Sequence, residues 1–344
     1  MLDRFGRQIN YLRISVTDRC NLRCVYCRAA EAGPYLPHED LLTLDEIVAM
    51  VRAAVAEGVD RVRLTGGEPL LREDIVALVA ALRAVRGIKA ITMTTNGLLL
   101  APKVAALKAA GLSRLNISLD TLRADRFHSV TGGKLEDVLR GIQEAEAHFE
   151  GIKLNVVVMR GVNDDEVADF VLMTMNKEIE VRFIEHMALG EGRLANPASF
   201  VSADEVLESI CKVGRLTPVE HDFRAGPARR FRFDGARGTI GLITPVSQPF
   251  CGRCNRLRLT SEGKLRSCLL RGGEVDVRAI LRNGASNVFA DRPAEPAGLN
   301  AGHAGLPIGK NTQELLREAL HKAADLKPKW HEGCGTVCMS KVGG

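Results

Sequence analysis

The stretch Tyr11-Leu-Arg-Ile-Ser-Val-Thr-Asp-Arg-Cys20-Asn-Leu-Arg-Cys24-Val-Tyr-Cys27 decides the fold of this 344-residue chain. Its first half, from Leu12 to Thr17, is rich in Leu, Ile, Val and Thr and predicts a short buried strand. Three cysteines follow at Cys-x3-Cys-x2-Cys spacing, and three thiolates on one loop can hold three corners of a four-iron cluster, which leaves the fourth iron open to a small molecule. The alternative is structural zinc, which takes four protein ligands and usually shows paired Cys-x2-Cys spacing. Cys20, Cys24 and Cys27 are therefore the first candidate metal ligands.

Strand and helix patterns alternate along the chain after this first strand. Apolar β-rich runs occur at 12–17, 61–65, 90–94, 114–119, 152–159 and 180–185, with helical patterns between them at 43–57, 72–86, 101–110, 134–149 and 163–175. Such alternation predicts a parallel sheet that is covered by crossover helices. Six units fall short of the eight in a closed barrel. We therefore expect an incomplete (β/α)6 TIM-like barrel, with a doubly wound open sheet as the alternative, and an active site at the carboxyl ends of the strands.

The alternation ends near residue 190. Beyond it the sequence predicts a helix at 202–213, short strands at 229–233, 238–243 and 256–260, a loop rich in Ala, Gly and Pro at 291–309, and a helix at 312–325. We divide the chain into a partial barrel over residues 1–225 and a C-terminal region over 226–344. Cys211 falls in a helical pattern and is expected to be a buried apolar residue.

A second cysteine triplet, Cys251, Cys254 and Cys268, lies in the C-terminal region at Cys-x2-Cys-x13-Cys spacing. No further Cys or His follows Cys268 within twenty residues, so a second cluster is favoured over zinc that is completed by a distant residue. Arg256 and Arg258 come directly after Cys254 and, in a strand, would point to the same face. Arginine binds phosphate through two parallel hydrogen bonds.

Basic residues also occur within the predicted barrel strands, at Arg13, Arg63 and Lys153. A free charge within an apolar strand is costly. Either internal salt bridges or a bound polyanion would balance these charges, and the polyanion is the sharper hypothesis.

The second predicted strand ends in Thr65-Gly-Gly-Glu-Pro69. A double glycine lets the backbone approach a ligand closely, and a glutamate offers an acceptor for an ammonium group; the alternative is an ordinary tight turn. Together with the first triplet, this turn resembles the signature of the radical S-adenosylmethionine superfamily. The resemblance implies that the open iron chelates S-adenosylmethionine, that an electron opens its sulfonium to a 5′-deoxyadenosyl radical, and that Tyr26, Gly67, Ser118 and Met187 contact it. His186 is expected to be a partly buried polar residue.

A narrower resemblance is carried by Thr17-Asp-Arg-Cys20, the Gly-Gly-Glu-Pro turn, Arg182-Phe-Ile-Glu-His-Met187, the stretch from Cys251 to Thr260 and the terminal Gly343-Gly344. This set is similar to the GTP 3′,8-cyclase family, which converts GTP to (8S)-3′,8-cyclo-7,8-dihydroguanosine 5′-triphosphate in the first step of molybdenum cofactor biosynthesis. The resemblance implies two 4Fe-4S clusters and S-adenosylmethionine as cofactors. It implies that GTP is bound by Arg13, Arg63, Thr94, Lys153, Arg256, Leu257 and Arg258, and that Arg13, Arg256, Arg258, Gly343 and Gly344 are catalytic.

The same resemblance implies a homodimer, an unidentified electron donor and a downstream cyclic pyranopterin monophosphate synthase. The alternatives are a radical peptide-modifying maturase and a non-catalytic electron carrier or zinc-dependent binding protein. For the Gly-Gly terminus the alternative is a frayed chain end.

Composition limits the class of protein. Hydrophobic residues make up 46% and charged residues 26%, as in ordinary soluble proteins, and a net charge of +5 does not call for nucleic acid as a partner. No apolar run reaches the roughly 18–20 residues that span a membrane, and the N-terminus has no apolar core, so we expect no secretory signal and a cytoplasmic location. Nine cysteines in such a setting argue against a disulfide framework; Cys334 and Cys338 receive no function.

Overall fold

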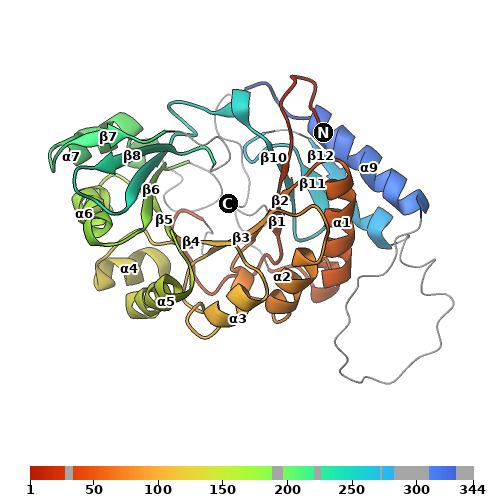
Figure 1. The fold of residues 1–344 in the computed structure, drawn as a ribbon, viewed down its shortest axis with the longest axis horizontal. Helices are drawn as coiled ribbons and strands as arrows, with labels where there is room; N and C mark the ends of the chain where they lie inside the picture. The colour runs from red at the N-terminus through yellow and green to blue at the C-terminus, as the bar shows by residue number, and fades with distance from the viewer. Residues whose placement is uncertain (28–33, 188–196, 221–225, 272, 283–309, 331–344) are drawn as a thin grey trace.

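The computed structural model describes residues 1–27, 34–187, 197–220, 226–271, 273–282 and 310–330. The described strands form one sheet in the order β12-β11-β10-β1-β2-β3-β4-β5-β6-β9-β8-β7 (Figure 1). The first six strands are β1 (Tyr11–Ser15), β2 (Arg61–Thr65), β3 (Ala90–Thr95), β4 (Arg114–Ser118), β5 (Lys153–Val158) and β6 (Glu180–Glu185). They are parallel and lie side by side in chain order. A doubly wound sheet would reverse its strand order, so the incomplete barrel is confirmed and the alternative is wrong.

Strands from the C-terminal region extend the sheet at both edges. β9 (Thr239–Ile243) pairs in parallel with β6, and β10 (Arg256–Leu259) pairs in parallel with β1. Antiparallel strands then follow, β8 (Arg229–Phe233) and β7 (Leu216–Pro218) beyond β9, and β11 (Lys264–Arg266) and β12 (Glu274–Asp276) beyond β10. The parallel part of the sheet is thus longer than the six expected strands. The division at residue 226 stays a prediction, and hydrogen-bonded strands join the two regions.

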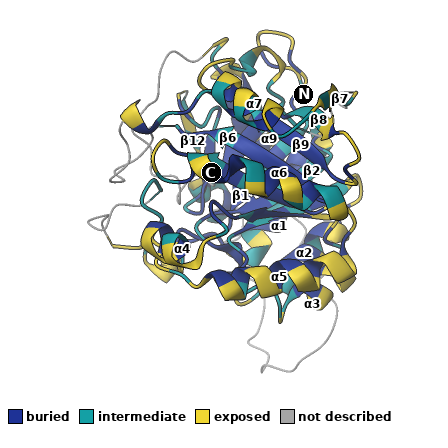
Figure 2. Ribbon diagram, turned by 90° about the vertical axis from the view of Figure 1, so that its left-hand side faces the viewer, coloured by how far each residue is buried: buried dark blue, intermediate teal, exposed yellow. Residues whose placement is uncertain are grey.

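Helices cover the outer face of this curved sheet (Figures 1 and 2). They are α1 (Leu44–Ala56), α2 (Ile75–Arg83), α3 (Val104–Ala109), α4 (Ala124–Thr131), α5 (Leu135–His148), α6 (Val167–Asn176), α7 (Ala203–Cys211) and α9 (Lys310–Asp325). Thr43 and Glu46 form the capping box that begins α1. The sequence did not predict α4, whose eight residues are too short and polar for a clear helical period. Cys211 is exposed, contrary to expectation, because the buried stripe of α7 consists of Ala203, Val206 and Ile210.

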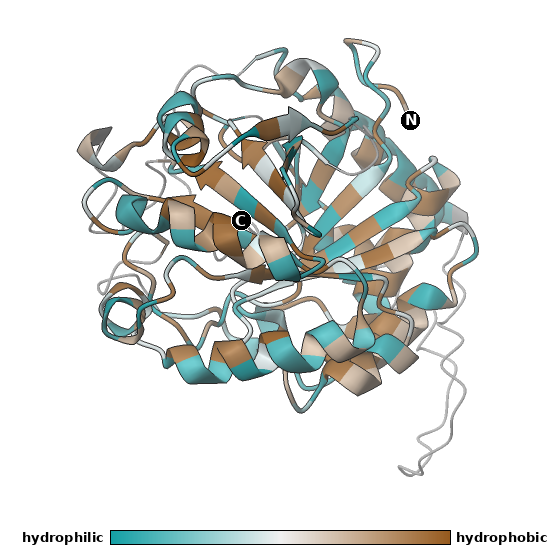
Figure 3. Cartoon of the chain, turned by 60° about the vertical axis from the view of Figure 1, so that its left-hand side comes forward, coloured by the Kyte–Doolittle hydropathy of each residue, from teal (hydrophilic) through white to brown (hydrophobic). Residues whose placement is uncertain are grey.

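The strands alternate between two faces of different character, as the hydropathy bands of Figure 3 show. Leu12 and Ile14 of β1 and Val62 and Leu64 of β2 are fully buried in the core beneath the helices. The residues between them, such as Arg13, point to the inner face. Barrels of this class usually fill their interior with branched apolar side chains. Here the inner face is polar, which makes it the place to look for a ligand.

The last described segment returns to the N-terminal half of the sheet. α9 packs against α1, β11 and β12, and its Arg317 and His321 lie 2.9 and 2.7 Å from the carboxylate of Glu57. Residues 326–330 are thereby placed beside the second cysteine triplet. Across the described residues, no helix combines the length and the apolar character needed to cross a membrane.

Candidate active site

The first cysteine triplet lies on the loop that follows β1, at the carboxyl end of the strands. Cys20, Cys24 and Cys27 are all half-buried. The loop is fastened to the end of α4, because Arg23 N donates to Thr131 O and Val25 N to Val130 O, each at 2.9 Å. The unpredicted helix α4 therefore holds the candidate ligands in place.

The Gly-Gly-Glu-Pro turn braces the same loop from the other side. Gly67 N donates to Thr17 O at 2.8 Å, and Glu68 N donates to Arg19 O at 2.7 Å. The Glu68 carboxylate accepts from Leu70 N, Asn96 N and Thr95 Oγ1 at 2.7 to 2.9 Å. Burial raises the pKa of Glu68 to about 7 against the opposing effect of these donors. Glu68 thus joins β2 to β3, a structural task that its motif did not reveal.

The chemistry of the first triplet fits a metal cluster. Burial, and then the neighbouring Cys27, Asp120 and Cys20, raise the pKa of the Cys24 thiol. Three thiolates so placed require positive charge to hold them, which iron supplies. Among the described residues, no three His, Cys, Asp or Glu side chains lie close enough together to hold a single metal ion. Each thiolate of a four-iron cluster binds a different iron, so a cluster requires a wider spacing than a single ion.

Polar groups converge beside this loop at the mouth of the barrel. Tyr26 donates its hydroxyl proton to Asp120 Oδ2 at 2.6 Å, and burial raises the pKa of Asp120 to about 6. The Tyr26 ring meets the His186 ring edge-on at 6.3 Å, and His186, which was expected to be partly buried, is only 3% exposed. Neither His186 Nε2 nor Asn155 Oδ1 has a hydrogen-bond partner among the described residues, although both atoms are buried. Buried polar atoms of this kind fit a small-molecule ligand at the mouth.

The other predicted S-adenosylmethionine contacts belong to the same carboxyl edge. Ser118 ends β4, Met187 follows β6, and Gly67 lies in the turn after β2; all three are half-buried. The structure therefore brings these residues to the mouth with Tyr26.

The second triplet lies at the opposite end of the strands. Cys251 and Cys254 precede β10, which runs parallel to β1, and Cys268 returns to the same level through the antiparallel β11. Burial opposes ionisation of Cys254, but Arg256 and Lys327 outweigh it and lower the pKa of its thiol to about 6. A cysteine that ionises easily suits metal ligation. The two triplets thus lie at opposite ends of one barrel.

Basic side chains occupy the inner face between the two triplets. Strand register places Arg13 beside Arg258 on one side and beside Arg63 on the other. Burial lowers the pKa of Arg13, and the charges of Arg258 and Arg63 lower it further. Burial, followed by the charge of Arg256, lowers the pKa of Arg258 to about 9. These cations repel one another. A bound anion would relieve that repulsion.

Two further strands add to this basic face. Arg63 Nε donates to Tyr11 Oη at 2.6 Å, and its Nη1 donates to Thr94 Oγ1 at 3.4 Å. On the far side, Glu180 accepts from Lys153 at 3.0 Å and from Arg182 at 2.5 Å.

Among the described parallel strands, Glu180 is the one acid on the inward-facing side. Burial acts to raise the pKa of Glu180, but Arg182 and Lys153 outweigh it and lower that pKa to about 2. Burial, followed by the charge of Arg182, lowers the pKa of Lys153 to about 8. Arg230 Nε also lies 3.6 Å from Glu180 Oε2. Because three cations face one acid, Glu180 keeps its charge and an excess of positive charge remains.

Leu257 is a predicted GTP contact whose side chain does not lie on the inner face of the barrel. The side chain of Leu257 is 1% exposed and belongs to the core on the helix side, opposite Leu12. Any contact from Leu257 to a ligand in the barrel would have to come from its backbone. Gly343 and Gly344, as well as Cys334 and Cys338, lie outside the described residues.

Several residues at the site were missed in the sequence. Glu180 and Arg182 alternate within a predicted strand, so their i, i+2 spacing could have placed them on the inner face with Lys153. Asp120 belongs to the polar stretch after the fourth predicted strand, which is expected at the mouth, but its role beside Tyr26 was not predicted. Lys327 had no signal in the sequence.

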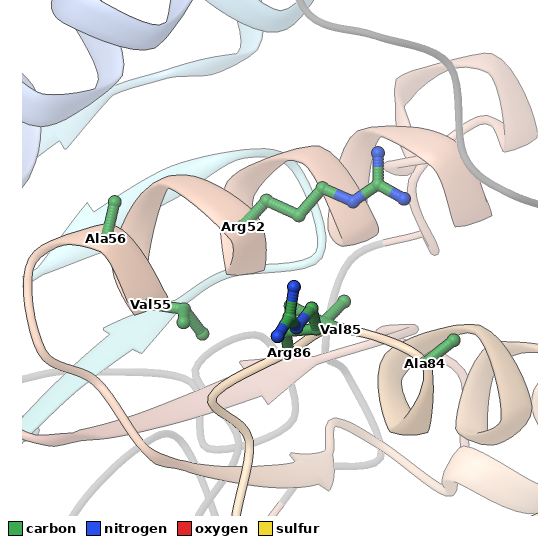
Figure 4. Close-up of a pocket in the computed structure, with 6 residues that line it drawn as sticks. All are labelled: Arg52, Val55, Ala56, Ala84, Val85 and Arg86. Atoms are coloured by element: carbon green, nitrogen blue, oxygen red, sulfur yellow. The ribbon is translucent and has the colours of Figure 1, made fainter.

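A surface hollow of about 450 Å³ lies elsewhere, between the end of α1 and the end of α2 (Figure 4). Its lining includes Arg52 and Arg86 among small apolar residues. These helix ends lead into β2 and β3, so the hollow is at the amino edge of the strands on the outside of the barrel. It contains none of the site residues.

Comparison with known proteins gives consistent results. The model of the Radical SAM superfamily matches residues 14–173, and that of Molybdenum Cofactor Synthesis C matches residues 179–292. The chain is 50% identical over 288 residues to a GTP 3′,8-cyclase of Pelotomaculum thermopropionicum, covering 83% of this chain and 89% of the relative. It is 44% identical over 353 residues to a GTP 3′,8-cyclase of Heliobacterium modesticaldum, covering 100% of both.

A solved structure shares the fold. Streptococcus suis SuiB bound to S-adenosylmethionine superposes with a TM-score of 0.55 at 16% identity, covering 83% of this chain and 66% of that one. At this identity the likeness shows the fold alone.

Proposed function

This chain belongs to the GTP 3′,8-cyclase family of radical S-adenosylmethionine enzymes, and we propose that it converts GTP to (8S)-3′,8-cyclo-7,8-dihydroguanosine 5′-triphosphate. The observation that carries this proposal is the basic inner face of the barrel, with a cysteine triplet at each end. A triphosphate is the polyanion that this face suits, because guanidinium groups bind phosphate oxygens in pairs. The reaction would be the first step of molybdenum cofactor biosynthesis.

The first triplet and the mouth would hold the radical-generating cofactors. Cys20, Cys24 and Cys27 would bind a 4Fe-4S cluster, which supplies the electron that opens S-adenosylmethionine when both are bound. Tyr26, Gly67, Ser118 and Met187 would hold S-adenosylmethionine. The hydrogen bond from Tyr26 to Asp120 fixes the ring of Tyr26 against the mouth, which supports an orienting role for that residue.

The inner face would bind the substrate. Arg13, Arg63, Arg256 and Arg258 would grip the triphosphate, with Thr94 and Lys153 contributing from β3 and β5 and Leu257 through its backbone. Cys251, Cys254 and Cys268 would hold a second 4Fe-4S cluster at the far end, against the guanine. Inside the barrel, the C3′ hydrogen of the sugar would pass to the 5′-deoxyadenosyl group released from S-adenosylmethionine, and C3′ would join C8. A second electron from the donor and a proton would complete the product. Arg13, Arg256 and Arg258 would touch the substrate and, with Gly343 and Gly344, are the catalytic residues of the proposal.

The remaining parts of the proposal concern the chain end and its partners. Gly343 and Gly344 would enter the active site, since only glycine allows so thin an insertion. The enzyme would act as a homodimer in the cytoplasm, receive electrons from a separate donor, and pass its product to a cyclic pyranopterin monophosphate synthase.

Anaerobic reconstitution tests the function. The protein is loaded with iron and sulfide, reduced, and supplied with S-adenosylmethionine and GTP, and both 5′-deoxyadenosine and the cyclised nucleotide are measured. We expect both products from the wild type and 5′-deoxyadenosine alone from Arg256→Met. Arg237→Met removes an exposed arginine and should behave as wild type. If the wild type cleaves S-adenosylmethionine and leaves GTP unchanged, the substrate assignment is wrong.

A further inference from the structure

Lys327 is a buried lysine that neither the sequence motifs nor the proposed reaction uses. It follows α9, and with 2% of its surface exposed it is among the largest fully buried side chains. Lysine is almost never fully buried unless its charge is balanced and its protons are accepted. The surroundings of this ammonium group therefore indicate what it does.

The Lys327 ammonium bridges two of the three cysteine segments at the second triplet. It donates to Arg256 O at 2.7 Å, to Ser267 O at 2.8 Å and to Cys254 Sγ at 3.6 Å. Ser267 is the residue before Cys268, and Arg256 begins β10 just after Cys254. An ammonium group has three protons, and here three acceptors meet them.

The third cysteine segment is tied to the same place through Arg7. Its Nη1 donates to Cys251 O at 2.7 Å, and its Nη2 donates to Pro328 O at 3.0 Å. Arg7 is itself held by Asp3, whose Oδ2 lies 2.6 Å from Arg7 Nε. Lys327, Pro328, Arg7 and Asp3, which we call the clasp, therefore contact the segments of all three cysteines.

The charges at the clasp are unequal. Asp3 balances Arg7, but no carboxylate of the described residues lies within ion-pair distance of Lys327. The thiol of Cys254 is the one acceptor of Lys327 that can become an anion. A buried ammonium in this position is stabilised by negative charge on the sulfur and on whatever metal the sulfur binds.

We propose that Lys327 is a positioning residue for the metal cluster held by Cys251, Cys254 and Cys268, fixing the Cys254 thiolate and favouring the reduced form of the cluster. This inference rests on the proposed function, which places a cluster on that triplet. Reduction adds one negative charge, and a positive charge with a hydrogen bond to a ligand sulfur raises the reduction potential of an iron–sulfur cluster. The clasp also ties together the backbone segments that carry the three ligands.

The test isolates the second triplet in the full-length chain. Cys20, Cys24 and Cys27 are all replaced by alanine, and the protein is reconstituted with iron and sulfide. Iron per chain, the rate of iron loss to a chelator, and the reduction potential from an anaerobic dithionite titration followed by electron paramagnetic resonance are then measured. Lys327→Met removes the charge and the donor, Lys327→Gln removes the charge and keeps a donor, and Lys327→Arg keeps both. Lys329→Met removes an exposed lysine two residues away and is the matched control.

We expect Lys327→Met to lose iron roughly 10 to 100 times faster, the range typical of a lost partner to a metal ligand. Its reduction potential should fall, by about 59 mV for each tenfold loss of preference for the reduced form. Lys327→Arg should retain the wild-type potential, and Lys329→Met should change neither quantity. Lys327→Gln should show the lower potential, so the conclusion does not depend on whether the methionine variant folds.

Two outcomes would overturn the proposal in different ways. If the triple alanine chain binds no iron, both the second metal site and the role of Lys327 are wrong. If it binds iron but Lys327→Met and Lys327→Gln leave the potential unchanged, the second metal site stands and Lys327 is only a structural residue.

Discussion

Replacing Gly67 with alanine tests whether the Gly-Gly-Glu-Pro turn positions the first cysteine loop. A Cβ atom on Gly67 would lie 2.1 Å from Arg19 O and 2.8 Å from Asp18 O, both of them backbone atoms just before Cys20. The backbone of Gly67 is not in the left-handed region, so this contact is the main cost of the substitution. Backbone atoms have no rotamer to change, and the loop itself must therefore move.

The size of the effect follows from these distances. Ordinary contact begins at 3.4 Å, so the turn and the loop must part by about 1.3 Å, the difference from 2.1 Å. The bonds from Gly67 N to Thr17 O and from Glu68 N to Arg19 O, now 2.8 and 2.7 Å, would then exceed hydrogen-bond length. Two lost hydrogen bonds at about 1 kcal/mol each, with about 1–3 kcal/mol for overpacking, lower the free energy of unfolding by roughly 3–5 kcal/mol.

The loop displacement should matter more to activity than the stability loss does. A shift of about 1 Å in a reacting group costs roughly 100-fold in rate, so cleavage of S-adenosylmethionine should fall by at least that factor. The assay measures iron per chain, 5′-deoxyadenosine formation and denaturant unfolding of Gly67→Ala. Gly151→Ala is the control, because Gly151 has φ +62° and no atom within 4 Å of its added Cβ. It should lose about 1–2 kcal/mol through backbone strain and keep its activity. Wild-type iron content and cleavage in Gly67→Ala would refute the reasoning.

Two further predictions concern the inner face. Arg258→Met removes a buried cation beside Arg256, so it should raise the melting temperature of the nucleotide-free protein by a few degrees and reduce the stabilisation by GTP. Thermal unfolding with and without GTP measures both effects. A lower melting temperature of the nucleotide-free variant would contradict the prediction. Glu180→Gln should reduce the loss in free energy of unfolding that occurs at acid pH. The pKa of Glu180 in the folded protein, about 2, is below its ordinary value of 4.5, so its contribution of about 3 kcal/mol to the free energy of unfolding is complete above pH 4.5 and is lost as the pH falls towards 2. Urea unfolding measures the free energy of unfolding across this pH range. If the variant shows the same dependence on pH as the wild type, the reasoning fails.

Much of the fold could be predicted because its signals are local. The runs at Arg61–Thr65 and Glu180–Glu185 coincide with β2 and β6, because each strand has an apolar face of alternate residues, Val62 and Leu64 in β2 and Val181 and Phe183 in β6. The capping box at Thr43 has its own short pattern. Helix α4 has none, because its eight residues are too few to establish a helical period.

By itself, the sequence determined the six-unit alternation, the two cysteine triplets and the arginine pair at 256 and 258, because each depends on residues only a few positions apart. Only the tertiary structure decided that β9 and β10 extend the parallel sheet at its two edges, and that the triplets therefore lie at opposite ends of one basic inner face. The same holds for Lys327, which reaches acceptors 60 to 73 residues away in the chain. Contacts between such distant residues follow no period in the sequence, since they are set by how the sheet curves and where α9 packs.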